Sequence, residues 1–166
     1  MTAVSIPRPV AEAIVRHARE ERPNEACGLI VGSARAEAGV PPRRYVACRN
    51  AAASPSRFLV DGEDLLRVLD ELDRTGGELW GVAHSHVRTA AVPSPTDIAE
   101  AAWPGAVHVL VSLAGDEDPP SLRAWRIAGG AATELALEID DDGAAEAEDA
   151  ARAANAIGAE GGGSGV

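Results

Sequence analysis

The chain has 166 residues, of which 46% are hydrophobic, and this is enough for one domain with its own core. Its formal net charge of −11 argues against a nucleic-acid partner, and because all fifteen basic residues are arginine, lysine nucleophile and Schiff-base chemistry is excluded. No apolar run approaches the roughly 20 residues of a membrane-spanning helix and no leader sequence is recognisable, so we expect a cytoplasmic protein without a membrane partner.

Hydrophobic periodicity and turn residues predict strands with interspersed helices. In chain order these are helix 7–21, strands 27–32, 43–49 and 57–60, helix 61–74, strand 78–85, helix 95–103, and strands 107–113, 121–127 and 132–139. Asp61 or Asp64 is expected to cap the second helix. Its buried stripe is expected to comprise Leu65, Leu66, Val68, Leu69 and Leu72. This pattern indicates an α/β or α+β layer fold.

The composition changes at Asp140. Residues 1–139 are expected to form the folded domain. Residues 140–166 form an acidic segment rich in alanine and glycine, with too few large apolar side chains to build a core. We therefore expect a disordered tail, in which a frayed helix over 144–157 is an alternative. Its glycines are typical of a flexible linker, because no ubiquitin-like domain precedes them.

The segment His84-Ser85-His86, followed by Asp97, carries the clearest chemistry. Two imidazoles and a carboxylate form the ligand set of a catalytic zinc whose fourth position is left for water. Side chains two residues apart on a strand leave the same face about 6.6 Å apart, so the histidines can converge on one ion. Ser94 predicts a helix N-cap whose first turn can return Asp97 to the strand end. The sequence thus predicts one zinc ion per chain, although Ser94 and Asp97 would also suit an ordinary helix cap.

Hydrolysis at such a centre also needs a group that accepts the proton of the attacking water. A carboxylate held outside the ligand set is suited to this role. Glu25 is the best candidate, because it lies between the predicted helix 7–21 and a strand whose apolar run needs no acid. An ordinary solvated acid in a helix-to-strand turn is the alternative.

The chain also contains two cysteines and a further histidine, His108, for which other roles are open. Cys27 offers a rival mechanism, in which its thiol is the nucleophile and a motif histidine is the base, but this leaves the downstream serine and acid unexplained. Cys27 and Cys48 are otherwise expected to be small buried hydrophobes. His108 is expected to be packed and hydrogen-bonded, with support of the metal ligands as the alternative.

The set Glu25, His84-Ser85-His86, Ser94 and Asp97 resembles the signature of the JAMM (MPN+) zinc metalloprotease family. That signature has an upstream Glu, then His-Ser/Thr-His, seven residues, Ser, two residues and Asp, and the spacing here is the same. The resemblance runs over roughly residues 4 to 137 and is strongest to an actinobacterial branch. Many family members have Pro directly after the second His, whereas this chain has Val87. Members of the actinobacterial branch also lack that Pro. It implies the JAMM/MPN (cytidine deaminase-like) fold, a curved mixed sheet packed between helices.

The resemblance also implies an activity. Family members cleave amide or isopeptide bonds after the Gly-Gly tail of ubiquitin-like proteins, with Glu25 as the proton carrier and Ser94 as a donor to the developing oxyanion. In the actinobacterial branch the substrate is a sulfur-carrier protein with a Gly-Gly-Cys terminus, and the cysteine released serves cysteine biosynthesis. The alternatives are a peptidase that trims or deconjugates other ubiquitin-like tails and a non-catalytic MPN scaffold, which the intact ligand set disfavours. A homodimer is compatible with the sequence, but no residue indicates one.

Overall fold

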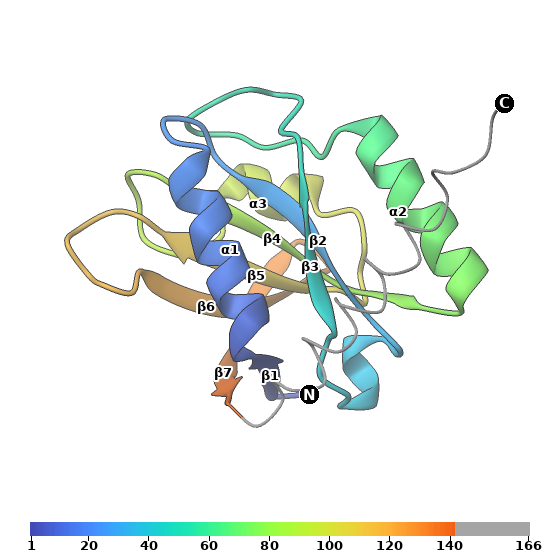
Figure 1. The fold of residues 1–166 in the computed structure, drawn as a ribbon. Coiled ribbons are helices and arrows are strands. Elements are labelled where there is room, and N and C mark those ends of the chain that lie inside the picture. The colour runs from blue at the N-terminus through green and yellow to red at the C-terminus, as the bar shows by residue number, and fades with distance from the viewer. Residues whose placement is uncertain (142–166) are drawn as a thin grey trace, which may run out of the picture.

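The computed structural model describes residues 1–141, which form a seven-stranded sheet with helices on both faces (Figure 1). The strands are β1 (Ala3–Pro7), β2 (Cys27–Gly32), β3 (Arg44–Cys48), β4 (Glu78–His86), β5 (Val107–Ser112), β6 (Ser121–Ala128) and β7 (Ala131–Asp140). The helices are α1 (Arg8–Glu20), α2 (Gly62–Thr75) and α3 (Pro95–Glu100), with a 3-10 turn at Ala36–Ala38. The strand order is β1-β7-β6-β5-β4-β2-β3. The sheet is mixed, because β1–β7 and β4–β5 pair in parallel and the remaining pairs are antiparallel.

The two long helices bury their apolar stripes on opposite faces of the sheet. Ile14 of α1 belongs to the larger core cluster, together with Ala83 of β4. Val68 of α2 packs in a second cluster with Val82 of β4. Figure 1 shows α1 in front of the sheet and α3 behind it. Successive residues of a strand point to opposite faces, so β4 directs Val82, His84 and His86 to the face that carries α2.

The position of β4 explains why its histidines are held rigidly. It lies between β2, where Cys27 is the Cα partner of His84, and β5, where Leu110 is the partner of His84. His84 and His86 are 2% and 4% exposed. Both imidazoles therefore project from a central strand into a nearly dry environment.

Several predicted boundaries are wrong. β1 was missed, because its five residues pair only with β7, at the far end of the domain. The predicted strand 57–60 is absent apart from one bridge between Asn50 and Val60. The predicted helix 95–103 ends at Glu100, because Ala101 adopts an extended conformation. In α2, Asp61 is the cap, and Leu66 is 63% exposed and lies outside the buried stripe.

The end of the domain extends slightly beyond its predicted boundary. Asp140 is the last residue of β7, so the strand runs one residue into the segment predicted as a tail. The rest of that segment, from residue 142 onward, lies outside the described residues, and its disorder stays a prediction. Within residues 1–141, no helix has the length and apolar character needed to cross a membrane.

Candidate metal centre

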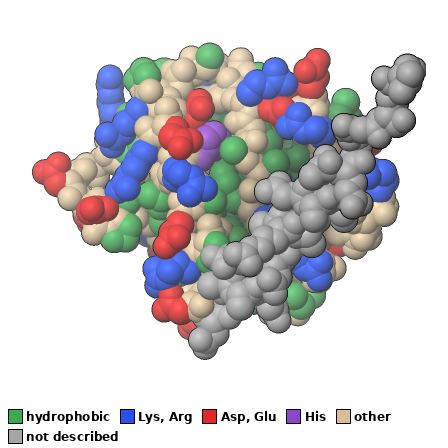
Figure 2. All heavy atoms as spheres, in the orientation of Figure 1, with side chains coloured by type: hydrophobic (Ala, Val, Ile, Leu, Met, Phe, Trp, Pro, Cys, Tyr) green, Lys and Arg blue, Asp and Glu red, His purple; other side chains and the backbone are tan. Residues whose placement is uncertain are grey.

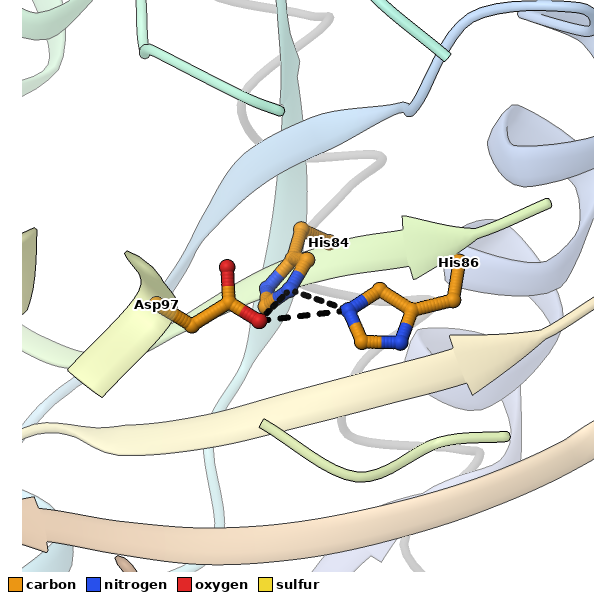
Figure 3. A group of neighbouring side chains, drawn as sticks. All are labelled: His84, His86 and Asp97. Carbon is orange, nitrogen blue, oxygen red and sulfur yellow. Dashed lines mark hydrogen bonds and ion pairs between the residues drawn. The ribbon is translucent and has the colours of Figure 1, made fainter. Parts of the chain in front are cut away.

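Two histidine side chains of β4 and an aspartate side chain at the start of α3 converge on one point (Figure 3). Nε2 of His84 and Nε2 of His86 lie 3.2 Å apart. Oδ2 of Asp97 lies 3.3 Å from the first nitrogen and 3.2 Å from the second. A tetrahedral zinc with bonds of about 2.0–2.1 Å places its ligand atoms about 3.3–3.4 Å apart. The three atoms therefore have the spacing of one face of such a tetrahedron.

The hydrogen-bond chemistry of this triangle also favours a positive charge. Nδ1 of His86 lies 2.8 Å from the carbonyl oxygen of Ala90, and because a carbonyl only accepts, this nitrogen carries the hydrogen. The neutral His86 ring then presents a lone pair on Nε2 toward Asp97, which also has only lone pairs to offer. Burial lowers the pKa of His86, but hydrogen bonds to Asp97 and Ala90 outweigh it, so that the pKa is raised. The carboxylate thus favours a positive charge at this point, which a proton or a metal ion supplies.

Asp97 combines the ligand position with a helix cap. Its N–H donates to Oγ of Ser94 at 3.1 Å, and its Oδ2 accepts from the N–H of Ser94 at 2.8 Å, forming a capping box at the start of α3. Burial opposes the charged form of Asp97, but hydrogen bonds to His84 and His86 outweigh it and hold the pKa of this carboxyl well below its usual range. The capping and ligand hypotheses are therefore compatible, because one carboxylate is placed for both.

The loop between β4 and α3 is anchored to the sheet. Oγ of Ser112 donates to the carbonyl of Thr89 at 2.6 Å, and Nε1 of Trp125 donates to the carbonyl of Ala91 at 3.0 Å. Together with the bond from His86 to Ala90, these contacts fix three consecutive residues of the loop. The loop consequently delivers Asp97 to the histidines in a defined orientation.

Glu25 lies beside this triangle and is not a solvated acid. It is only 4% exposed, and its Oε2 is buried without a hydrogen-bond partner among residues 1–141. Burial raises the pKa of Glu25 to about 7, while the charge on His86 lowers it and that on Asp97 raises it. A carboxyl with a pKa near neutrality is suited to both taking and returning a proton.

Asn50 holds the backbone of Glu25 in place, a role that the sequence analysis missed. Its Nδ2 donates to the carbonyls of Glu25 and Arg57, each at 3.0 Å. Its Oδ1 accepts from the N–H groups of Ala52 and Leu59, also at 3.0 Å. A loop asparagine that bonds to four backbone groups is typical of turns. The bond to Glu25, however, joins residues 25 positions apart, so local sequence patterns do not predict it.

Ser85, the middle residue of the histidine motif, has a structural role on the other face of β4. It is fully buried, its Oγ accepts from the N–H of Ala26 at 2.8 Å, and its own N–H donates to the carbonyl of Ala26 at 3.0 Å. Ser85 therefore links β4, which carries His84 and His86, to Ala26, the residue that follows Glu25. Sequence spacing indicated only that its side chain points away from the histidines.

We predict that Ser85→Ala lowers the free energy of unfolding by about 1–3 kcal/mol, because the N–H of Ala26 loses its side-chain acceptor in a dry environment. Urea denaturation of the purified variant measures this change. Ser56→Ala is the matched control, since Ser56 is exposed and, within residues 1–141, its side chain hydrogen-bonds only to Ser54; its stability should be that of the wild type. Equal stability of the two variants would show that the Ser85 bond is not important.

The rival mechanism based on Cys27 is not supported. Both cysteines are free and buried, as expected. Sγ of Cys27 lies 3.6 Å from the carbonyl of Arg49, and burial raises the pKa of this thiol to about 12. Burial likewise raises the pKa of Cys48 to about 11. A thiol that stays protonated at neutral pH is a poor nucleophile.

His84 and His108 each have a buried nitrogen without a partner. Nδ1 of His84 and Nε2 of His108 make no hydrogen bond within the described part of the chain. The ring of His84 stacks on Phe58 with centroids 4.2 Å apart, a contact that sequence analysis did not predict because residues 57–60 were assigned to a strand. His108 is 4% exposed, so the prediction of a packed histidine is confirmed, but among residues 1–141 its Nε2 has no hydrogen-bond partner.

The chain is similar to known proteins over most of its length. Residues 7–128 match the sequence family Prok-JAB, described as prokaryotic homologs of the JAB domain. The chain is 37% identical over 130 residues to the CysO-cysteine peptidase of Mycobacterium tuberculosis. The aligned residues cover 78% of this chain and 86% of that protein. It is 32% identical over 117 residues to the desampylase of Haloferax volcanii, covering 68% of this chain and 82% of that protein.

The solved structures extend the likeness to three dimensions. A solution structure of a protein from Desulfitobacterium hafniense superimposes with a TM-score of 0.74 at 27% identity, covering 83% of this chain and 93% of that one. The expected curved mixed sheet between helices is therefore confirmed. The ligand triangle formed by His84, His86 and Asp97 occurs within the region that matches the family.

Proposed function

Because the chain belongs to the family of prokaryotic JAB-domain homologues, we propose that it is a zinc-dependent peptidase of the JAMM type. Its substrate in this proposal is a ubiquitin-like sulfur-carrier protein, and it cleaves the amide bond after the carrier's Gly-Gly terminus and releases cysteine. The observation that carries the proposal is the triangle of ligand atoms, whose 3.2–3.3 Å edges suit one tetrahedral zinc. A cytoplasmic location and a homodimer stay predictions.

The residues around the triangle would divide the chemistry among them. His84, His86 and Asp97 would hold one zinc ion per chain. When bound, zinc lowers the pKa of a water molecule toward about 7 and polarises a carbonyl group. Glu25 would take the proton of the attacking water and return it to the leaving amine, in keeping with its buried carboxyl of raised pKa.

Ser94 would stabilise the charge that develops on the scissile carbonyl oxygen. Its Oγ already accepts from the N–H of Asp97, and a hydroxyl that accepts one bond still has its own hydrogen to donate. Ser94 sits directly beside a proposed zinc ligand, so this hydrogen is available near the reacting carbonyl. Removal of such a donor typically lowers kcat by about 10²–10³-fold.

The relatives support the choice of substrate. The relative at 37% identity is named a CysO-cysteine peptidase, which favours cysteine as the released residue and a small carrier as the acyl part. The name of the second relative, desampylase, favours instead the removal of a ubiquitin-like tag from a target protein. Deconjugation is therefore the second candidate function, and both share the Gly-Gly bond and the same metal centre.

We predict about one zinc per chain in purified protein, and loss of one cysteine's mass from a carrier ending in Gly-Gly-Cys. A chelator should abolish this hydrolysis and added zinc should restore it. Treating the enzyme with a thiol alkylator, which is removed before the substrate is added, should have no effect, because neither buried thiol takes part. Mass spectrometry and metal analysis provide the readouts. Zinc below about a tenth of an equivalent, or hydrolysis that resists chelators, would contradict the proposal; cleavage of only lysine-linked conjugates would favour deconjugation.

A further inference from the structure

A cavity of about 290 Å³ lies next to the candidate metal centre and shares Asp97 with it. Residues 57–60 and Leu65 of α2 form one side of the cavity, and residues 100–103 at the end of α3 form the other. Its remaining wall is the sheet, through Val82 of β4 and His108 of β5, which are register partners. Figure 2, in the orientation of Figure 1, shows the face covered by α1, so the cavity beside α3 lies on the opposite face of the sheet.

His108 gives this largely apolar cavity a single polar group within the sheet. It is 4% exposed, and its Nε2 has no hydrogen-bond partner among residues 1–141. Burial lowers the pKa of His108 to about 4, so its ring is neutral at physiological pH and has one nitrogen with a free lone pair. A buried polar atom without a partner has a cost, and a donor on a bound molecule would remove it.

We propose that this cavity receives the side chain of the residue that is released, and that it selects an uncharged side chain such as that of cysteine. The inference rests on the proposed function, in which the two residues before the cleaved bond are glycines without side chains. The Cα of the released residue lies about 3.8 Å from that of the last glycine. The first residue with a side chain on the carrier lies about 6.6 Å away in the opposite direction, so the cavity beside Asp97 fits the released residue better.

The lining of the cavity supports an uncharged occupant. Most of the residues that line it are apolar, and burial among apolar groups disfavours a charged side chain of either sign, while Arg57 and Glu100 at its border pair with each other. The thiol of cysteine is small and apolar and has a weak S–H donor. In the tautomer that carries its hydrogen on Nδ1, Nε2 of His108 is a suitable acceptor for that hydrogen.

An ion pair limits how far an occupant can extend. Arg57 and Glu100, from the two sides of the cavity, are joined by an N–O contact of 2.7 Å between side chains that are 53% and 45% exposed. This contact links the sides of the cavity near the solvent. A single terminal residue fits within that limit, whereas a lysine that continues into a second protein would have to break the pair.

The test varies the released residue on one carrier and measures kcat/KM with zinc-loaded enzyme. Carriers ending in Gly-Gly-Cys, Gly-Gly-Leu and Gly-Gly-Asp are compared, and we expect the Asp adduct to be cleaved at least about ten-fold less efficiently than the Cys adduct. Leu65→Ala enlarges the cavity and should raise the Leu-to-Cys ratio about ten-fold. Leu69→Ala is the matched control: Leu69 is also partly buried on α2 but is not among the described residues that line the cavity, so the ratio should stay as in the wild type.

A second variant tests the polar contact directly. His108→Phe keeps an aromatic ring but removes the nitrogen, so the preference for cysteine over its methyl isostere 2-aminobutyrate should fall about three-fold or more. Binding is followed independently of turnover in zinc-loaded Glu25→Gln. There, Gly-Gly-Cys peptides should shift the NMR signals of the Trp103 indole and the His108 ring, and Gly-Gly alone should not.

The outcomes separate the cavity from the proposed function. If Leu65→Ala changes the preference for the residue that precedes Gly-Gly and not for the released residue, the cavity belongs to the carrier side and the inference is wrong. Absence of the peptide-dependent shifts would also overturn it. Peptides that give the shifts but are never cleaved by the wild-type enzyme would instead overturn the proposed function and leave the cavity assignment standing.

Discussion

Glu25→Gln is expected to bind zinc at the wild-type ratio while hydrolysis of a carrier-Gly-Gly-Cys adduct falls by about 10³-fold. The amide has the shape of the carboxyl but cannot accept a proton, and proton transfer by a positioned side chain typically contributes 10²–10⁴-fold. The three ligand side chains are untouched, so the metal content should not change. Single-turnover hydrolysis followed by mass spectrometry, with zinc measured on the same sample, checks both parts.

The same variant, without metal, should have a higher free energy of unfolding than the wild type above neutral pH, because it lacks the buried charged carboxyl. Burial raises the pKa of Glu25 to about 7 in the folded chain, above the ordinary value of about 4.3. The folded state therefore binds a proton more tightly than the unfolded state, and the charged carboxyl costs stability as the pH rises from about 4 through 7. Metal-free Glu25→Gln should be more stable than metal-free wild type at pH 8 and similar to it at pH 4.

Glu20→Gln is the matched control for this experiment. Glu20 is an exposed acid at the end of α1, close in sequence to Glu25 but on the solvated side of the turn. Its replacement should leave turnover and the pH dependence of stability unchanged. Comparable turnover in Glu25→Gln would show that another group carries the proton and that the assignment of Glu25 is wrong.

The cluster of His84, His86 and Asp97 was predictable because its information is local. A spacing of two residues on a buried strand brings His84 and His86 to one face, and a serine and proline at a helix start fix where Asp97 lies. The return of Asp97 to the histidines needs only a short loop. Sequence alone therefore predicted the ligand set, and the 3.2–3.3 Å distances agree with it.

The environment of Glu25 could not be predicted, because it depends on pairings between distant segments. Its N–H donates to the carbonyl of Ser54, and its carbonyl accepts from Asn50. Residues 57–60 have strand-like composition, but the carbonyl of Arg57 and the N–H of Leu59 bond to the Asn50 side chain, and apart from the bridge between Asn50 and Val60 the segment does not join the sheet. Local periodicity does not report such side-chain to backbone competition, and the same error concealed Phe58 beside His84.

Asp97→Ala is expected to weaken zinc binding at least about 100-fold. Loss of a hydrogen-bonding partner behind a metal ligand already costs 10–100-fold in affinity, and Asp97 supplies both the only carboxylate of the triangle and its negative charge. Competition with a chelator of known affinity measures the change. Circular dichroism should show that the fold is retained, because α3 has only six residues and buries none of them.

Ser94→Ala separates the two roles of Asp97. This variant removes the hydroxyl that accepts from the N–H of Asp97 and should cost about 1 kcal/mol of stability, but the carboxylate remains in place to bind zinc. Its zinc affinity should therefore be close to that of the wild type even though its turnover falls. If Asp97→Ala also retained zinc, the carboxylate would be a helix cap only.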